Sequence, residues 1–282
     1  MNLFGLALRL FFLAALAVVL PGAGTWAAGA LIETPAKQAI LVDHATGTVL
    51  FSKNPEQSMP PSSMSKLMTL YMLFDRLASG GLSLEDTFPV SKKAWRMGGS
   101  KMFVRVDTEV KISDLIRGII IQSGNDACIV VAGGIGGDEA SFAALMNDTA
   151  RELGMLDSHF VNASGWPDPD HVTTAKDLSI LARHMIDKFP QYYPIFAERS
   201  FTYSKIRQGN RNPLLYKNIG ADGLKTGHTE AAGYGLVASA QRKGRRLDLV
   251  VNGLGSVNQR SRESQRLLSW GFREFGNYAL FK

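Results

Sequence analysis

The chain has 282 residues and a formal net charge of +6, with 45% hydrophobic and 20% charged residues. This length supports one large core or a compact two-lobed domain. Cys128 is the only cysteine, so an internal disulfide is excluded. It lies in an apolar run, which indicates that it packs in the core. The five histidines are scattered without ligand spacing, so we predict no metal and no cofactor. The positive charge suits an anionic substrate, but no basic stripe with interleaved aromatic residues is present, so we expect no nucleic-acid partner.

Residues 1–30 have the pattern of a secretory signal peptide. Arg9 is the only charge ahead of an apolar core over 10–20, and small residues follow Pro21. The alternative is a membrane-spanning helix, but the apolar run is shorter than the ~20 residues that a span needs. We therefore expect export, cleavage near Ala27 or Ala30, and one mature domain over 31–282.

The first third of the mature chain predicts a hairpin followed by a helix. Two apolar runs over 38–51, separated by a turn that contains Gly47, predict two strands that form a hairpin. The stretch 60–71 predicts a loop stopped by prolines and then a serine-capped apolar helix that ends at Gly80 and Gly81. We interpret 91–106 as an irregular surface connection, the alternative being a mobile loop near a site.

The middle third is predicted to be helical. A short helix capped by Ser113 should lead into Ser123, and two further helices over 126–134 and 138–153 should be separated by the glycines of 133–137. A loop rich in turn residues covers 162–171. The next helix begins with Thr174 as its N-cap and runs to about Lys188.

From Ser200 the period of the apolar residues changes to two, which predicts strands. The predicted strands cover 201–203, 223–227, 233–242 and 247–254, and a final helix covers 258–275. We interpret the basic turn 242–246 as a solvated hairpin tip. Strands at both ends with helices between them predict an α+β fold, in which the first hairpin pairs with the last strands and a helical lobe flanks one antiparallel sheet.

Ser63 and Lys66 form the first chemical motif, S-x-x-K, which occurs once. Side chains three residues apart on a helix lie roughly 5–6 Å apart, so the amine of Lys66 can reach the hydroxyl of Ser63. This is a nucleophile beside a base, at a helix start that favours an anion. The alternative is an ordinary N-cap serine and a surface lysine.

Two further motifs follow along the chain. Ser123-Gly-Asn125 places a hydroxyl and a carboxamide at a turn, although S-x-N also occurs at Ser52 and Ser256. Lys225-Thr-Gly-His228 alternates as a strand would, and its glycine allows another backbone to approach. Alone, this last motif also fits an exposed edge strand with a protective lysine.

The three motifs together, in the order S-x-x-K, S-x-N and K-T-G, resemble the penicilloyl-serine transferases. The surrounding residues 61–69, 122–127, 210–212 and 222–229 are similar to the low-molecular-mass D-alanyl-D-alanine carboxypeptidases, and the similarity runs from about Ala36 to the end. This resemblance implies a β-lactamase/DD-peptidase-like fold with a five-stranded antiparallel sheet. It also implies a periplasmic location.

The implied activity removes the terminal D-alanine from peptidoglycan stem pentapeptides through an acyl-enzyme on Ser63. Lys66 would be the base, which requires its pKa to fall from ~10.4 to about 7.5 by burial and by repulsion from Lys225. Ser123 would relay a proton to the leaving amine and Asn125 would hold the substrate amide. The backbone N–H groups of Ser63 and His228 would form the oxyanion hole. The implied substrate-binding residues are Thr226, Gly227, His228, Arg211 and Arg260.

The implied partners are the stem peptide and β-lactam inhibitors. Many family members continue into a β-rich C-terminal domain and an amphipathic helix for peripheral inner-membrane association, and we find no such anchor before Lys282. A D,D-endopeptidase, a serine β-lactamase and a non-catalytic muropeptide-binding module are the alternatives. Gly124, where class A β-lactamases prefer Asp, argues against a β-lactamase, as does the lack of their Glu-x-x-x-Asn loop over 164–177.

Overall fold

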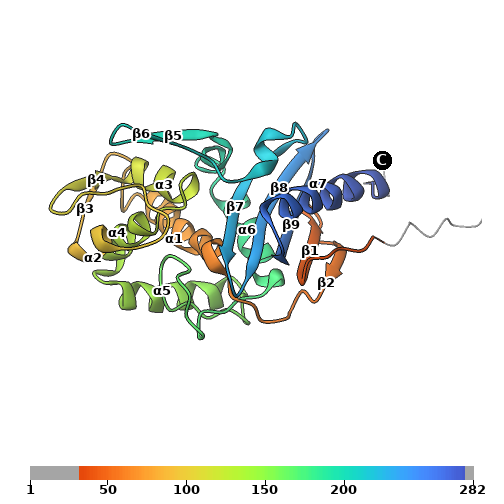
Figure 1. Cartoon of the computed structure of the whole chain (residues 1–282), viewed down its shortest axis with the longest axis horizontal. Helices are drawn as coiled ribbons and strands as arrows, with labels where there is room; N and C mark the ends of the chain where they lie inside the picture. The colour runs from red at the N-terminus through yellow and green to blue at the C-terminus, as the bar shows by residue number, and fades with distance from the viewer. Residues whose placement is uncertain (1–31, 277–282) are drawn as a thin grey trace, which may run out of the picture. The chain divides into compact units, whose positions relative to one another are not determined.

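The computed structural model describes residues 32–276. The predicted signal peptide, over 1–30, lies outside the described residues. Figure 1 shows an antiparallel sheet on one side and a group of helices on the other, with α1 (Lys66–Ala78) running between them. The predicted α+β fold class is thereby confirmed.

The main sheet has five antiparallel strands in the order β2-β1-β9-β8-β7. The first hairpin therefore pairs with the last strands, as predicted, and β7 lies at an edge. Gly47 makes the first turn with a φ of 72°, in the left-handed region that glycine adopts at no steric cost. The strands are β1 (Gln38–Asp43), β2 (Val49–Lys53), β7 (Ala221–Thr229), β8 (Gly233–Arg242) and β9 (Arg245–Leu254).

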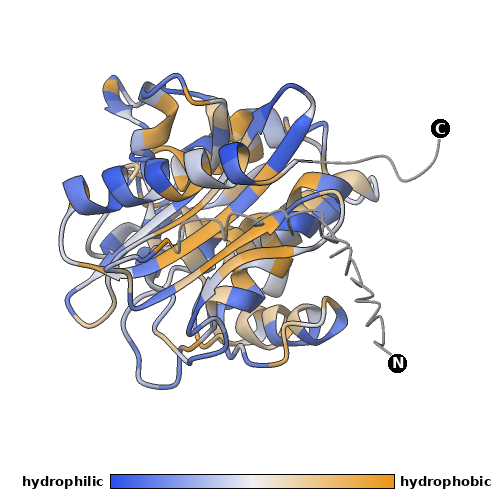
Figure 2. Cartoon of the chain, turned by 90° about the vertical axis from the view of Figure 1, so that its right-hand side faces the viewer, coloured by the Kyte–Doolittle hydropathy of each residue, from blue (hydrophilic) through white to orange (hydrophobic). Residues whose placement is uncertain are grey.

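The two faces of this sheet belong to two separate hydrophobic cores, because side chains alternate along each strand. On β1, Ile40 and Val42 contribute to the core shared with the helical lobe. Ala39 and Leu41, which alternate with these two residues along β1, contribute to the core under the last helix. Figure 2 shows the strand centres as hydrophobic where the sheet faces the viewer. The sheet is thus covered on both faces.

The helical lobe surrounds α1, whose side chains are almost all buried. Cys128 is buried in this core as predicted, and burial raises the pKa of its thiol to about 12. Within residues 32–276, no single helix is long and apolar enough to cross a membrane. Helices α4 (Asn125–Gly136) and α5 (Glu139–Glu152) meet this criterion only as a pair, and the pair is bent by 81°. The helices are α1 (Lys66–Ala78), α2 (Lys92–Arg96), α3 (Ile112–Ile120), α4 (Asn125–Gly136), α5 (Glu139–Glu152), α6 (Ala175–Lys188) and α7 (Val257–Glu274), with 3-10 turns η1 (Ser62–Ser65), η2 (Tyr193–Ala197) and η3 (Pro213–Tyr216).

Two short hairpins lie outside the main sheet. The strand predicted at 201–203 exists as β5 (Ser200–Tyr203), but it pairs only with β6 (Ile206–Gly209) in a sheet of its own. A second hairpin of β3 (Thr87–Pro89) and β4 (Glu109–Lys111) was not predicted. Three-residue strands carry too little periodicity to be recognised in the sequence.

The predicted serine cap of the helix after Pro61 is wrong. The chain enters through η1, with Ser62 at a φ of 46°, and α1 begins only at Lys66. Neither helical segment has a side-chain cap, and the hydroxyl of Ser65 instead donates to the carbonyl of Ser62 at 3.0 Å. The close packing of η1 against β7, and not a local cap, holds the start of this helical segment in place.

Two other helix boundaries differ from prediction. Ser113 is not a cap, because α3 begins one residue earlier and its N-cap, Lys111, makes no side-chain hydrogen bond. The glycines of 133–137 do not all separate two helices. Helix α4 continues to Gly136, and only Gly137, at a φ of 79°, ends it. Burial of the first two turns of α4 outweighs the low helix propensity of its last glycines.

The interpretation of 242–246 as a solvated tip is also wrong for its arginines. Arg245 donates to the carboxylate of Asp43 at 2.8 Å, and Arg246 donates to that of Asp222 at 2.7 Å. Within 242–246, only Lys243 and Gly244, at the turn itself, are exposed. These arginines therefore join neighbouring segments of the sheet instead of extending into water.

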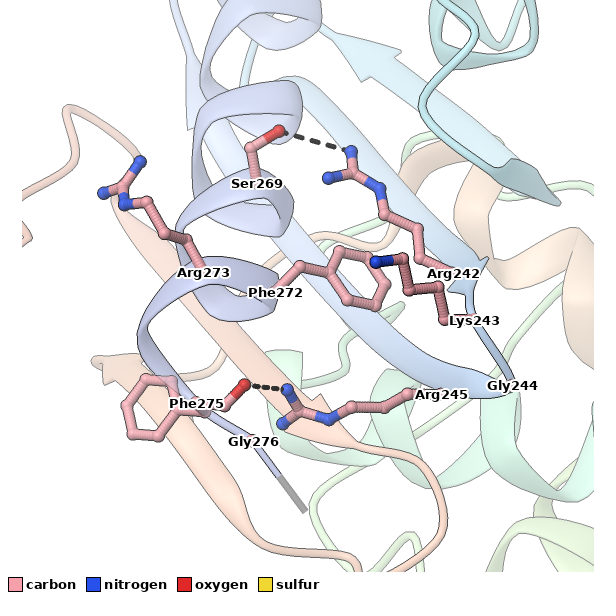
Figure 3. A pocket seen from close by; sticks show the side chains of 9 residues that line it. All are labelled: Arg242, Lys243, Gly244, Arg245, Ser269, Phe272, Arg273, Phe275 and Gly276. Atoms are coloured by element: carbon pink, nitrogen blue, oxygen red, sulfur yellow. Dashed lines mark hydrogen bonds between the residues drawn. The ribbon is translucent and has the colours of Figure 1, made fainter.

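A hollow of about 630 Å³ lies between the β8–β9 turn and the end of α7 (Figure 3). Arg242 lines it, and the guanidinium carbon of Arg242 lies 4.7 Å from the ring centroid of Phe272. None of the predicted site residues lines this hollow. We therefore do not place the chemistry there.

His44, directly after β1, is held between two carboxylates. Its Nδ1 lies 2.6 Å from Oδ2 of the buried Asp248 on β9, and its Nε2 lies 2.9 Å from Oδ1 of Asp187 on α6. The hydrogen bond to Asp248 is the largest cause of a raised His44 pKa. The protonated imidazole thus links the sheet to the helical lobe.

This link predicts a stability that falls as pH rises. A histidine with a raised folded-state pKa stabilises fully below its unfolded value of ~6.5 and loses that contribution as pH passes the folded value. His44→Asn should therefore lower the Tm clearly at pH 5.5 and much less at pH 9, as measured by thermal unfolding across that range. His184→Asn on α6 is the control, because burial lowers the pKa of that histidine. A Tm loss from His44→Asn that is equal at both pH values would contradict the assignment.

Candidate active site

Ser63 and Lys66 meet at the junction of η1 and α1. The Nζ of Lys66 donates to the Oγ of Ser63 at 2.8 Å. Lys66 is fully buried, whereas Ser63 is half-buried and reachable from outside. The geometry is that of a hydroxyl nucleophile with an amine in direct hydrogen-bond contact.

The second motif lies at the corner between α3 and α4. Ser123 has a φ of 58°, and Asn125 is the first residue of α4. The Oδ1 of Asn125 accepts a hydrogen bond from Lys66 at 2.8 Å, while its Nδ2 donates to the carbonyl of Gly98 at 2.9 Å. The first two motifs are therefore joined through the amine of Lys66.

The third motif lies on the edge strand β7. The Nζ of Lys225 donates to the Oγ of Ser123 at 2.9 Å and to the backbone carbonyl of Thr226 at 3.0 Å. A Cβ added to Gly227 would lie 2.2 Å from the Oγ of Ser62, so only glycine lets β7 pack this closely against η1. The five predicted catalytic residues therefore form two hydrogen-bonded sets, Ser63 with Lys66 and Asn125, and Ser123 with Lys225, which the backbone of 123–125 connects.

Burial controls the charge of this group. It lowers the pKa of Lys66 to about 8, and the charge of Arg211 adds to the shift. Burial and the charge of Lys66 together hold the pKa of Lys225 well below its ordinary value. Burial also lowers the pKa of Arg260 to about 10. Burial lowers the pKa of Lys66 as expected, but the cation that adds to this shift is Arg211 and not Lys225 as predicted.

The predicted substrate-binding residues lie around the same edge of β7. Thr226 is buried, and Arg211 donates to the hydroxyl of Ser100 at 2.6 Å. Arg260, from α7, reaches the carbonyl of Gly227 at 3.5 Å. His228 is exposed and stacks on Tyr234, with the ring centroids 3.9 Å apart. Cationic side chains from three separate segments therefore surround the site.

Sequence reasoning missed the loop that closes the group from the other side. The carbonyl of Ser164 accepts a third hydrogen bond from Lys66. The side chain of Asn162 shapes this loop, because its Oδ1 accepts from the backbone N–H groups of residues 164, 165 and 166. The only local signal was an asparagine before a run of turn residues.

The interpretation of 91–106 as a surface connection is wrong for its second half. The carbonyl of Ser100 accepts from the backbone N–H of Asn125 at 2.7 Å. We refer to residues 98–104 as the strap. The buried carboxylate of Asp126 holds the strap by accepting from the backbone N–H groups of residues 102, 103 and 104. A backbone-to-carboxylate clamp between distant segments leaves no periodic signal in the sequence.

The sequence model of the peptidase S11 family, described as D-alanyl-D-alanine carboxypeptidase, matches residues 25–255. D-alanyl-D-alanine carboxypeptidase DacC of Escherichia coli is 41% identical over 260 residues, which cover 89% of this chain and 65% of that protein. The chain thus spans about two thirds of the length of this relative.

Solved structures agree with the sequence comparison. D-alanyl-D-alanine carboxypeptidase DacD from Francisella tularensis superposes with a TM-score of 0.88 at 33% identity, covering 90% of this chain and 74% of that one. Penicillin binding protein 5 from Haemophilus influenzae superposes with a TM-score of 0.84 at 38% identity, covering 86% and 72%. The predicted DD-peptidase-like fold is confirmed, and the chain belongs to the D-alanyl-D-alanine carboxypeptidase family, peptidase S11.

Proposed function

We propose that this protein is a serine-type D-alanyl-D-alanine carboxypeptidase that removes the terminal D-alanine from peptidoglycan stem pentapeptides. The observation that carries the proposal is the 2.8 Å hydrogen bond between Lys66 and Ser63, in a group that includes Asn125, Ser123 and Lys225. Family membership supports the same reaction class. The proposed location is the periplasm, following export.

Acylation begins at Ser63, which attacks the carbonyl of the penultimate D-alanine. Lys66 takes the hydroxyl proton, for which its amine must be neutral. With a pKa of about 8, roughly one molecule in ten holds neutral Lys66 at pH 7, against about one in 2,500 for an ordinary lysine. Burial of this amine therefore raises the population of the competent base by roughly two hundredfold.

The leaving D-alanine needs a proton on its amine. The hydroxyl of Ser123 accepts a hydrogen bond from Lys225 at 2.9 Å. The Ser123 hydroxyl donates its proton to the departing nitrogen, and Lys225 resupplies it. Lys66 next releases the proton that it took from Ser63 to bulk water, and Lys225 regains one from it. Water then attacks the ester on Ser63 with Lys66 as base, the proton passes from Lys66 to the Ser63 oxygen as the ester bond breaks, and the shortened peptide leaves.

The cationic side chains around β7 bind the C-terminal carboxylate of the substrate. Arg211 offers a planar donor pair suited to this group, with Thr226 and Arg260 beside it. The backbone N–H groups of Ser63 and His228 hold the oxyanion, where one donor is typically worth ~2.7–4 kcal/mol. β-Lactams present a similar carboxylate beside a reactive amide and acylate the same serine.

The first prediction concerns the nucleophile. Ser63→Ala removes the only atom that forms the ester, so it should abolish both D-alanine release and covalent labelling by a fluorescent penicillin. Labelling is read by gel fluorescence, and mass spectrometry locates the adduct in the wild type. The control is Ser58→Ala, an exposed serine nearby, which should label normally. Labelled Ser63→Ala protein would refute the assignment of Ser63 as the nucleophile.

A cross-linked dimer peptide and nitrocefin, offered in parallel, separate carboxypeptidase from endopeptidase and β-lactamase activity.

The second prediction concerns Lys66. Because only its neutral form accepts the proton, the rate of acylation by penicillin should rise about tenfold per pH unit at low pH and level off near pH 8. Lys66→Arg cannot deprotonate in this range and should acylate at least about a hundredfold more slowly. Stopped-flow acylation from pH 5.5 to 9.5 measures both effects, with the exposed Lys93→Arg as control. A flat profile in the wild type would exclude Lys66 as the base.

The third prediction concerns the contact between β7 and η1. Gly227→Ala places a Cβ within 2.2 Å of the Ser62 hydroxyl and forces one segment to move. A shift of about 1 Å beside the nucleophile can reduce rates roughly a hundredfold, so acylation should slow greatly while circular dichroism stays native. Gly133→Ala, where nothing lies within 4 Å of the added atom, is the matched control. Equal acylation by the two variants would show that this contact does not position Ser63.

A further inference from the structure

The amine of Lys66 must be held in one orientation to act on Ser63. A protonated lysine has three N–H donors, and those of Lys66 go to the Oγ of Ser63, the Oδ1 of Asn125 and the carbonyl of Ser164. The neutral amine keeps two N–H groups and gains a lone pair. When these two groups stay on Asn125 and Ser164, the lone pair points at the hydroxyl of Ser63. The carbonyl of Ser164 is therefore one of the two acceptors that direct the base.

The loop that carries this carbonyl is held at the preceding residue, Ala163. The backbone carbonyl of Ala163 accepts from the hydroxyl of Thr69 on α1 at 2.7 Å, and both residues are fully buried. The side chain of Asn162 accepts from the N–H groups of residues 164–166 and leaves that of Ala163 to another acceptor. This acceptor is Oε1 of Glu139, at 3.2 Å. Ala163 is thus held between α1 and the start of α5.

Glu139 reaches the loop from outside the three motifs. It is the first residue of α5, and its side chain is 13% exposed. Its second carboxylate oxygen, Oε2, lies 2.7 Å from the amine of Lys93 on α2, which is an exposed side chain. An ion pair with so exposed a lysine is weak, because water screens it. What Glu139 supplies is the acceptor for the N–H of Ala163, a buried donor that is costly to leave without a partner.

We propose that Glu139 is a positioning residue for the base of this reaction. By accepting from Ala163, it holds the carbonyl of Ser164 on the amine of Lys66, so that the lone pair of this amine stays directed at the nucleophile. This inference rests on the proposed carboxypeptidase function and adds a residue on which the same site depends. Glu139 takes no part in proton transfer or bond breaking.

Loss of this carboxylate should change two properties of Lys66 together. Glu139→Ala leaves the N–H of Ala163 without its acceptor, so the loop moves and the carbonyl of Ser164 withdraws from the amine. The lone pair then loses part of its orientation, and misplacement of this kind lowers rates by roughly ten- to a hundredfold. The lost hydrogen bond favoured the charged amine, so the pKa of Lys66 should fall further below its value of about 8.

The test is the pH profile of Ser63 acylation by penicillin, measured by stopped flow from pH 5.5 to 9.5. In Glu139→Ala we expect the limiting rate at high pH to fall at least about tenfold, and the midpoint to move to lower pH by about half a unit or more. A smaller folded fraction would reduce only the amplitude of labelling and would leave the midpoint in place. The variants keep all the charged and titratable groups that act on Lys66 or respond to its charge: Lys225, Arg211, Asp126, Cys128 and His171.

Glu139→Gln separates the hydrogen bond from the charge. Its amide oxygen can still accept from Ala163 although the negative charge is gone, so the midpoint and the limiting rate should stay near their wild-type values. Lys93→Gln removes the ion pair alone and should behave in the same way. Glu152→Ala, at an exposed position at the other end of α5, is the matched control for removing a carboxylate from this helix.

A wild-type profile in Glu139→Ala would overturn the inference, as would a slower rate with an unmoved midpoint, which is the sign of a purely structural effect. A midpoint that falls as far in Glu139→Gln as in Glu139→Ala would also overturn it, because the charge alone would then explain the shift. These results leave the proposed function intact, since the wild type is still acylated at Ser63 and releases D-alanine. Absence of both in the wild type would instead refute the proposed function itself.

Discussion

The structure depends on the burial of two lysine amines side by side. Removing Lys66 and Lys225 from water is costly, and it is tolerated because each amine donates to fixed oxygens of its surroundings. Those oxygens come from η1, the α3–α4 corner, the loop 162–166 and β7 itself. Satisfying these amines therefore forces four separated segments to converge, and the same burial lowers the pKa of the Lys66 amine.

The fold is arranged so that these segments arrive with little freedom. Helix α1 is buried between the sheet and the lobe, and η1 at its start packs against the edge strand through Gly227. The strap over 98–104 is held by the carboxylate of Asp126, which fixes the carbonyls that accept from Asn125. Supporting contacts of this kind hold a catalytic group within the small tolerance that reaction geometry demands.

The site also has a direction. Cationic side chains gather at the Lys225 end of β7, and a largely apolar hollow lined by Trp166 and Asp168 lies at the other end, beside Thr229. An edge strand offers its unpaired backbone groups to an extended peptide, so β7 can bind a peptide through its backbone. The same arrangement explains why the larger hollow beside α7, which has no catalytic group in its wall, is not the site.

The α+β class and the three motifs could be predicted from the sequence, because apolar periodicity and short motifs are local signals, and the order of strands and helices then predicted that the first hairpin pairs with the last strands. The sequence did not show that Ser63 lies in a 3-10 turn without a cap, that residues 98–104 contact the site, or that Ser164 and Asp126 support it. These contacts join backbone groups to side chains far away in the chain. The constraints that place them, the satisfaction of buried charges and the packing of β7 on η1, exist only once the chain is folded.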